Sequence, residues 1–264
     1  MIDIHSHILP NIEGDDGSRS FDMSLGMLKM AVQAGTTDMI ATPHVNRHGV
    51  VPSWTAVTEA VRILQEKADI EEIPIHIYAG AEVELNYKAL DFLPARSQAY
   101  CLAESNYILV ELTEQSQPDQ TEELLYALML RGYMPVLAHP ERYDRIMTHP
   151  ERVLVWMQKG VLTQCNMGSF VGVFGKQAQR NAGNLLKHHM IVFLGSDAHR
   201  TDWRTPDQTA GLKAIEKLGG SWQKCSQNAQ YILQKKLVYP NIPEHWEKPK
   251  TGFWNRLLGY RLNS

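Results

Sequence analysis

A buried strand is predicted at Met1-Ile2-Asp3-Ile4-His5-Ser6-His7, and it ends in two histidines one residue apart. Because side chains at positions i and i+2 of a strand lie on the same side, His5 and His7 can converge on one metal ion. A lone His-x-His pattern is also typical of two half-buried structural histidines. The ends of the other strands are therefore needed to distinguish a metal site from a structural pair.

The composition is that of an ordinary globular protein. The chain has 264 residues, of which 44% are hydrophobic and 21% charged, and its formal net charge is -3. This length fits one α/β barrel of about 250 residues or two small domains. The slightly acidic charge gives no argument for a nucleic-acid partner. No segment has the roughly 18 apolar residues needed to span a membrane, and no signal peptide is recognisable, so we expect a cytoplasmic protein.

The three cysteines do not indicate a disulfide framework or thiol chemistry. Cys101, Cys165 and Cys225 are odd in number, widely spaced and not arranged as Cys-x-x-Cys. This pattern argues against paired disulfides and against a zinc knuckle. None of the three is followed by arginine six residues later, so the Cys-x5-Arg phosphate loop of the thiol-dependent phosphatases is absent.

Short apolar runs rich in β-formers alternate with helical segments along the chain. Glycine follows three of the four helical segments named below, as expected for left-handed C-caps. Alternation of this kind predicts a parallel sheet, and seven repeats predict a closed or nearly closed α/β barrel in a single domain. The predicted strands are Met1–His5, Asp38–Thr42, Ile75–Ala79, Tyr107–Leu112, Met134–Ala138, Val161–Asn166 and Ile191–Gly195, and four predicted helices are Phe21–Ala34, Ser53–Ala68, Asp119–Leu130 and Pro150–Lys159.

The last part of the chain differs from the rest, so we predict a barrel over residues 1–240 and a basic amphipathic tail over residues 241–264. Prolines interrupt regular structure, and from Lys248 onward there are basic residues and no acid. Such a tail could dock on an anionic membrane surface or a partner protein, or pack as a helix against the barrel or a neighbouring subunit. Its basic residues are Lys248, Lys250, Arg256 and Arg261, interleaved with Phe253, Trp254, Leu257, Leu258 and Tyr260.

Six of the seven predicted strands end in, or contain near their ends, an imidazole or carboxylate side chain. Catalytic residues of α/β barrels lie at these C-terminal strand ends. Independent polar loop residues would explain any one of them, but poorly explain six strands. Ten candidates exceed the needs of one metal ion and fit two or three ions with bridging carboxylates. They are His5, His7, His44, Glu82, Glu111, His139, Asp197 and His199, with Asp15 and Asp16 in the loop after the first strand.

These motifs resemble the polymerase and histidinol phosphatase (PHP) superfamily of metal-dependent phosphoesterases. Within it they are most similar to the bacterial tyrosine-protein phosphatases of capsule and exopolysaccharide loci. The resemblance covers residues 1 to about 237, with the motifs in the family's order. They are Ile4-His5-Ser6-His7-Ile8-Leu9-Pro10, Asp15-Asp16-Gly17-Ser18, Ala41-Thr42-Pro43-His44, Gly80-Ala81-Glu82, Ala138-His139-Pro140-Glu141-Arg142-Tyr143 and Ser196-Asp197-Ala198-His199.

The resemblance implies a distorted seven-stranded (β/α) barrel with a trinuclear site, usually studied with manganese, although iron and zinc also tolerate these ligands. Asp16 is the aspartate that matches the family, but the preceding loop is two residues longer, which leaves Asp15 as an alternative. The implied ligands are His5, His7, Glu82 and Asp197 for the first ion, Glu82, Glu111 and His139 for the second, and His44, His199 and Asp16 for the third.

Clustered divalent ions lower the pKa of bound water, so a hydroxide can attack phosphorus without a covalent intermediate. By the resemblance, Arg142 and Arg204, which follow the ligands His139 and His199, contact the substrate phosphate. Surface salt bridges are the alternative role for these arginines. The predicted function is therefore that of a metal-dependent protein-tyrosine phosphatase. Its predicted substrate, by analogy alone, is a bacterial tyrosine kinase that governs polysaccharide assembly.

Three other functions fit the sequence less well. A small-molecule phosphatase of the same superfamily, acting for example on histidinol phosphate, would use the same metal chemistry, although the Asp-Asp-Gly-Ser and His-Pro-Glu-Arg motifs favour the tyrosine branch. A 3′-5′ exonuclease is disfavoured because the chain has no long basic stripe to follow a nucleic-acid backbone. An inactive scaffold that binds a kinase through the tail is disfavoured by the intact ligands at six strand ends.

Overall fold

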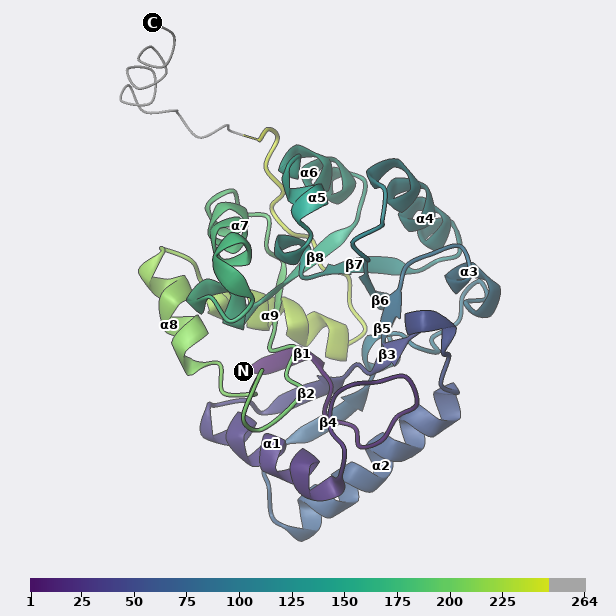
Figure 1. The fold of residues 1–264 in the computed structure, drawn as a ribbon, viewed down its shortest axis with the longest axis vertical. Helices are drawn as coiled ribbons and strands as arrows, with labels where there is room; N and C mark the ends of the chain where they lie inside the picture. The colour runs from purple at the N-terminus through teal and green to yellow at the C-terminus, as the bar shows by residue number, and fades with distance from the viewer. Residues whose placement is uncertain (247–264) are drawn as a thin grey trace, which may run out of the picture.

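The computed structural model describes residues 1–246, and within them the chain has a mixed α/β fold with parallel strands (Figure 1). All seven predicted strands are present. The first sheet contains β1 (Ile2–Ser6), β2 (Asp38–Ala41) and β4 (His76–Ala79), in the order β1-β2-β4. The second has the order β3-β5-β6-β7-β8-β9 and contains β3 (His44–Val45), β5 (Glu82–Glu84), β6 (Tyr107–Glu111), β7 (Met134–Ala138), β8 (Leu162–Asn166) and β9 (Phe193–Gly195).

Two strands, β3 and β5, were not predicted as separate elements. They continue β2 and β4 after short interruptions, at Thr42-Pro43 and Gly80-Ala81. Pro43 has no N–H for a sheet hydrogen bond, and a Cβ at Gly80 would lie 2.9 Å from Ile40 Cγ2. The chain therefore passes from the first sheet to the second at both interruptions. Because β3 and β5 pair in parallel, His44 lies directly beside Glu82.

The two sheets meet again where β1 lies beside β9 (Figure 1). His5 O accepts a hydrogen bond of 2.8 Å from Asp197 N, and His7 N donates one of 2.8 Å to Ala198 O. A parallel bridge also joins Ser6 to Ala198. The strands nevertheless form two hydrogen-bonded sheets within residues 1–246, so the closed barrel remains a prediction.

The helices cover the outer faces of the sheets. The four predicted helices are confirmed within two residues at each end, and the glycines that follow three of them have the positive φ of left-handed C-caps: Gly35 (89°), Gly132 (89°) and Gly160 (109°). The helices are α1 (Phe21–Gln33), α2 (Trp54–Ile70), α3 (Ala89–Phe92), α4 (Pro118–Leu130), α5 (Asp144–Met147), α6 (Pro150–Gln158), α7 (Gly175–Lys187), α8 (Thr209–Lys217) and α9 (Trp222–Leu233), with 3-10 turns η1 (Arg47–Gly49), η2 (Leu102–Glu104), η3 (Pro140–Arg142) and η4 (Met167–Val171).

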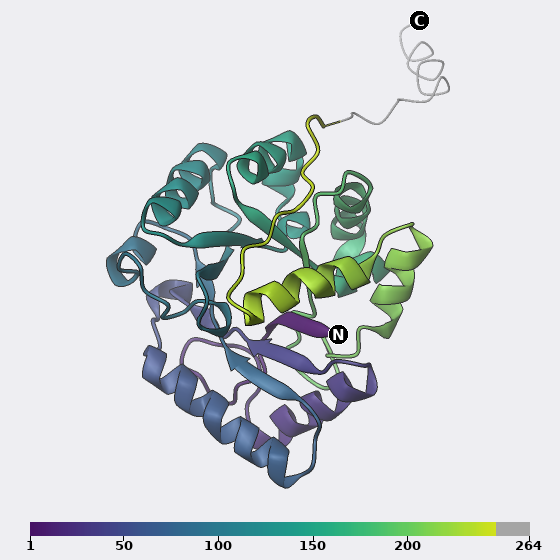
Figure 2. The ribbon, with the colours of Figure 1, turned by 180° about the vertical axis from the view of Figure 1, so that it is seen from behind.

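Helix α9 crosses the N-terminal ends of β1 and β9 (Figure 2). Ser226 Oγ accepts from Ile2 N at 3.3 Å, and Asn228 Nδ2 donates to Val192 O at 3.0 Å. This helix closes the end of the fold opposite the predicted site. Within residues 1–246 no helix is both long and apolar enough to cross a bilayer. The basic residues of the predicted tail, from Lys248 onward, lie outside the described residues.

Apolar side chains from both sheets fill the interior between the strands and helices. Ile4, Ile40, Leu109, Val136 and Phe193 are fully buried in one cluster that joins β1 to β9. At the C-terminal ends of the same strands the buried residues become polar. This change from an apolar to a polar interior marks the place where the candidate ligands gather.

Candidate metal centre

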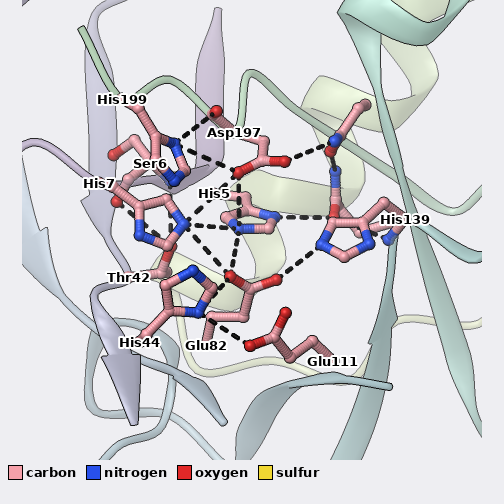
Figure 3. A network of polar contacts seen from close by, with 12 residues as sticks. His5, Ser6, His7, Thr42, His44, Glu82, Glu111, His139, Asp197 and His199 are labelled. Carbon is pink, nitrogen blue, oxygen red and sulfur yellow. Dashed lines mark hydrogen bonds and ion pairs between the residues drawn. The ribbon is translucent and has the colours of Figure 1, made fainter. Parts of the chain in front are cut away.

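The nine predicted metal ligands come together at the C-terminal ends of the strands, as Figure 3 shows for eight of them. Their donor atoms form three groups, each with all atoms within 4.8 Å of one another. His139 is in contact with one of these groups, because its Nε2 lies 2.7 Å from Glu82 Oε1. The groups are His5, His7, Glu82 and Asp197; His7, Asp16, His44 and His199; and His44, Glu82 and Glu111.

Glu82 lies at the centre of this arrangement and is 1% exposed. Its Oε2 is 3.2 Å from His5 Nε2, 3.2 Å from His7 Nε2 and 3.2 Å from His44 Nδ1. Within the described residues, Oε2 nevertheless has no hydrogen-bond partner. A buried carboxylate oxygen surrounded by imidazole nitrogens without a hydrogen bond is what a bridging metal ligand requires, so the donor set fits divalent cations.

His5 and His7 face each other through their Nε2 atoms, which are 3.3 Å apart. Their other ring nitrogens have acceptors. His5 Nδ1 lies 3.0 Å from Gln164 Oε1, and His7 Nδ1 lies 2.7 Å from Asp15 Oδ1. A proton on each Nδ1 satisfies these oxygens and leaves both Nε2 lone pairs free. This is the arrangement in which neighbouring groups orient imidazoles toward a metal ion.

The loop after β1 separates the roles of its two aspartates. It folds back on His7, since Ser18 N donates to His7 O at 3.0 Å and a Cβ at Gly17 would lie 2.2 Å from that oxygen. Asp15 is buried and binds His7. Asp16 Oδ1 instead lies 3.1 Å from His199 Nε2 and 3.5 Å from His44 Nε2. Asp16 thus belongs to a candidate donor group, whereas Asp15 contacts the ring of His7.

Asp197 connects the metal ligands to the two predicted phosphate-binding arginines. Its Oδ2 accepts a hydrogen bond of 2.8 Å from Arg142 Nη1 and one of 2.7 Å from Asn166 Nδ2. Its Oδ1 forms an ion pair with Arg204. Asp197 has a φ of 53°, and His139 has a φ of 33°. Such left-handed conformations are strained for residues with a side chain, and they are concentrated at functional sites.

Glu111 and Arg47 complete the rim of the centre. Glu111 Oε1 is 2.9 Å from His44 Nδ1, so Glu111 shares a group with His44 and Glu82. The family resemblance groups Glu111 with His139 instead. Arg47 Nη1, for which the sequence suggested no role, lies 2.8 Å from Asp16 Oδ1. His44 thus contacts two groups, one through each ring nitrogen.

Positive charge is favoured at the centre of the site. Burial opposes ionisation of every group, but the imidazoles around Glu82 and Asp197 hold the pKa of both carboxyls well below the usual range. Despite burial, Glu82 raises the pKa of His44 to about 9. Burial and the neighbouring His7 lower the pKa of His199 to about 4. The carboxylates therefore stay ionised, and their charge can be balanced by protons on the imidazoles or by metal cations.

Comparison with known proteins assigns the chain to a family. The family model for capsular polysaccharide synthesis, CpsB/CapC, matches residues 1–234. The chain belongs to this family. It is 35% identical over 257 residues to tyrosine-protein phosphatase YwqE of Bacillus subtilis, covering 96% of this chain and 100% of YwqE. It is 27% identical to the putative tyrosine-protein phosphatase CapC of Staphylococcus aureus, covering 96% of this chain and 99% of CapC.

Solved structures of CpsB/CapC family members agree with this assignment. Crystal structures of YwqE from Bacillus subtilis and CpsB from Streptococcus pneumoniae, metal-dependent tyrosine phosphatases, match with a TM-score of 0.83 and 33% identity, over 94% of this chain and 100% of theirs. A dihydropyrimidinase from Brevibacillus agri matches with a TM-score of 0.50 and 14% identity, over 92% of this chain and 73% of its own. The second match concerns the fold alone. The predicted resemblance to the capsule-locus phosphatases is confirmed.

Two residues of β8 are part of the site, although the sequence analysis found no ligand at the end of this strand. Gln164 and Asn166 are fully buried and hold His5 and Asp197 respectively. They orient ligands and were missed because only charged and imidazole side chains were sought. Amide side chains two residues apart on a buried strand were the signal that could have found them.

Replacing Asp15 with asparagine is expected to weaken manganese binding by about 10–100-fold, the usual cost of losing a residue that orients a metal ligand. The backbone N–H of His44 also donates to Asp15 Oδ1, so the amide would keep its oxygen toward His7 Nδ1. It would lose the negative charge that makes His7 Nε2 a more basic ligand. Calorimetric titration with manganese would measure the change. Asp22, which is exposed in the first turn of α1, provides the control, since Asp22→Asn should leave the affinity unchanged. Equal affinities for Asp15→Asn and the unmodified protein would contradict an orienting role.

Proposed function

We propose that this protein is a metal-dependent protein-tyrosine phosphatase that acts at a capsule or exopolysaccharide locus. The observation that carries the proposal is the position of Glu82, a buried carboxylate shared by donor groups from four strands. Membership of the CpsB/CapC family and similarity to YwqE support the same activity. The described residues thus contain a site suited to several cations.

We infer that two or three ions bind, with manganese the first choice and iron or zinc compatible with the donors. The ligands would be the three donor groups above, with His139 beside Glu82. When bound, divalent ions lower the pKa of a coordinated water and neutralise phosphate charge. The chain itself supplies the ligands, orients them through Asp15, Gln164 and Asn166, and keeps the carboxylates ionised.

Arg142 and Arg204 would hold the phosphate group of the substrate. Both guanidinium groups already pair with the carboxylate of Asp197 at the edge of the ligand cluster, and Arg142 is 31% exposed. A guanidinium presents several N–H donors in a plane that matches a pair of phosphate oxygens. The leaving tyrosinate has a reference pKa of about 10 and so needs less protonation than an alkoxide would.

A thiol mechanism is disfavoured by the state of the cysteines. Burial raises the pKa of Cys101 to about 12 and that of Cys225 to about 12, and it raises the pKa of Cys165 far above its usual value. Thiols of this kind are poor nucleophiles at neutral pH. Hydrolysis by water without a covalent intermediate is the mechanism that these residues favour.

We also infer the larger organisation of the chain. The two parallel sheets would act as one distorted seven-stranded (β/α) barrel, in which β2 with β3 and β4 with β5 each count as one interrupted strand. Residues 1–240 would form this catalytic unit and residues 241–264 a tail with a separate role. A cytoplasmic location and a tyrosine kinase of polysaccharide assembly as the substrate complete the proposal.

Removing the residues after Pro249 is expected to slow dephosphorylation of a membrane-anchored tyrosine kinase while sparing a soluble phosphotyrosine peptide. The removed segment contains most of the tail's basic residues, which could attract an anionic membrane surface. Rates on the kinase in vesicles and on the peptide would be compared for both chain lengths. Unchanged dephosphorylation of the vesicle-bound kinase by the shortened chain would contradict this role.

The function is tested by measuring kcat/KM of the manganese-loaded protein on a phosphotyrosine peptide and on histidinol phosphate. We expect a strong preference for the peptide. Preference for histidinol phosphate would keep the metal chemistry but make the protein a small-molecule phosphatase. No activity on either substrate, with manganese bound, would support an inactive scaffold.

A further inference from the structure

One aromatic ring lies against both phosphate-binding arginines. The guanidinium carbon of Arg142 is 4.7 Å from the centre of the Phe174 ring, and that of Arg204 is 5.2 Å from the same centre. Phe174 is partly buried and directly precedes α7, whereas Arg142 belongs to η3 and Arg204 to the loop after β9. The ring therefore brings together two cations from different parts of the chain.

A second ring lies near Arg204 alone. The centre of the Trp203 ring is 5.5 Å from the guanidinium carbon of Arg204. Trp203 is 57% exposed, so water weakens its attraction for the cation. The backbone of Arg204 is fixed independently, because His199 N donates to Arg204 O at 2.8 Å. Phe174 is the more buried of the two rings and the one that contacts both arginines.

The arginines need a partner other than Asp197. Asp197 Oδ1 lies 3.6 Å from His5 Nε2 and 3.5 Å from His7 Nε2, within one of the candidate metal groups. A carboxylate that binds a cation attracts the guanidinium groups less strongly. A contact with the face of an aromatic ring uses none of the arginine N–H donors, so these remain available for phosphate oxygens.

The position of the Phe174 ring is fixed by its surroundings. A Cβ at Gly168 would lie 3.3 Å from Phe174 Cε2, so the ring packs directly over this glycine in η4. The same turn is tied to η3, because Glu141 Oε1 accepts from Ser169 Oγ at 2.7 Å and from Asn166 N at 2.9 Å. Glu141 immediately precedes Arg142. The Phe174 ring and Arg142 are therefore held by one set of contacts between η3 and η4.

We propose that Phe174 is a positioning residue that holds Arg142 and Arg204 over the metal centre, ready for a phosphate group, with Trp203 as a weaker support for Arg204. The inference rests on the proposed function in one respect, namely that the arginines meet the substrate phosphate. It assigns to an aromatic side chain outside all of the metal-ligand motifs an effect on phosphate affinity that acts through the two arginines.

The test is calorimetric binding of inorganic phosphate to the manganese-loaded protein, with two variants at one position. Phe174→Leu keeps an apolar side chain but removes the ring face, and should weaken phosphate binding by about three- to tenfold. Phe174→Tyr keeps the face and should bind phosphate within about twofold of the unmodified protein. Trp203→Leu should have a smaller effect than Phe174→Leu, because only Arg204 is involved.

Two further variants separate positioning from a general structural effect. Tyr126 is 57% exposed, like Trp203, but lies on α4, so Tyr126→Leu should leave phosphate affinity unchanged. Gly168→Ala would place a methyl group 3.3 Å from both the Phe174 ring and Val173, and should weaken phosphate binding in the same direction as Phe174→Leu. Manganese content and melting temperature identify any variant that fails to fold.

The phosphate affinities of the Phe174 variants either support or contradict the role of the ring. Weak binding by Phe174→Leu, restored by Phe174→Tyr, supports the role of the ring face. Equal phosphate affinity for Phe174→Leu and the unmodified protein would overturn it, as would equally weak binding by both Phe174 variants. Since phosphate binding can be measured without turnover, a protein inactive on phosphotyrosine would refute the proposed function and still allow this test.

Discussion

Replacing Glu82 with glutamine is expected to lower kcat on a phosphotyrosine peptide by about 10³-fold, the upper end of what losing one preorganised electrostatic group costs. The amide has nearly the same shape but no charge. Its carbonyl oxygen cannot hold cations between His5, His7 and His44 as a carboxylate can. Bound manganese, measured by atomic absorption after gel filtration, should also fall, because Glu82 belongs to two of the three donor groups.

Glu84 provides a matched control for this substitution. It lies on the same strand, two residues further on, and is partly buried, but its Oε1 accepts from Asn86 Nδ2 at 3.0 Å. Burial raises the pKa of Glu84, whereas the pKa of Glu82 is lowered. Glu84→Gln should keep kcat within about twofold, as expected for a substitution away from critical contacts. Full manganese content and activity in Glu82→Gln would contradict a role for Glu82 as a metal ligand.

The strands could be predicted from the sequence because each long one has a clear local signal. Met134–Ala138, for example, is an apolar, β-forming run that follows α4 and the positive-φ glycine Gly132. The short strands β3 and β5 have no such pattern. After the interruptions at Pro43 and Gly80, β3 pairs with β5 and β5 pairs with β6, in the second sheet. This pairing depends on residues that are far apart in the sequence.

The candidate ligands could be predicted for a related reason. Parallel strands bring their C-terminal ends together, so imidazoles and carboxylates at those positions must meet. Gln164 and Phe174 act on side chains from other strands or loops, and nothing adjacent in the sequence indicates these partners. The different positions of Asp15 and Asp16 could not be predicted from the sequence, because they depend on how the loop folds back on His7.

Removing the metal ions with a chelator is expected to abolish activity and to lower the melting temperature, and adding manganese should restore both. Ligands that bind only the folded state stabilise it by about 2.7 kcal/mol at 100 times the dissociation constant. For a chain of this size that corresponds to about 5–10 °C in melting temperature. Scanning calorimetry of the chelated and manganese-loaded protein at pH 7 measures the difference.

This difference should grow between pH 7 and pH 9. In the metal-free protein, protons on the imidazoles balance the buried carboxylates, and the pKa of His44 is raised to about 9. A pKa raised on folding gives stability that is complete below the unfolded pKa of about 6.5 and is lost as the pH rises through the folded value. Metal ions require neutral imidazoles, so they bind more tightly as those protons leave.

The chelated protein should therefore melt at a lower temperature at pH 9 than at pH 7, while the manganese-loaded protein changes less. Parallel declines of the two melting temperatures would show that protons and metal ions do not compete for these histidines.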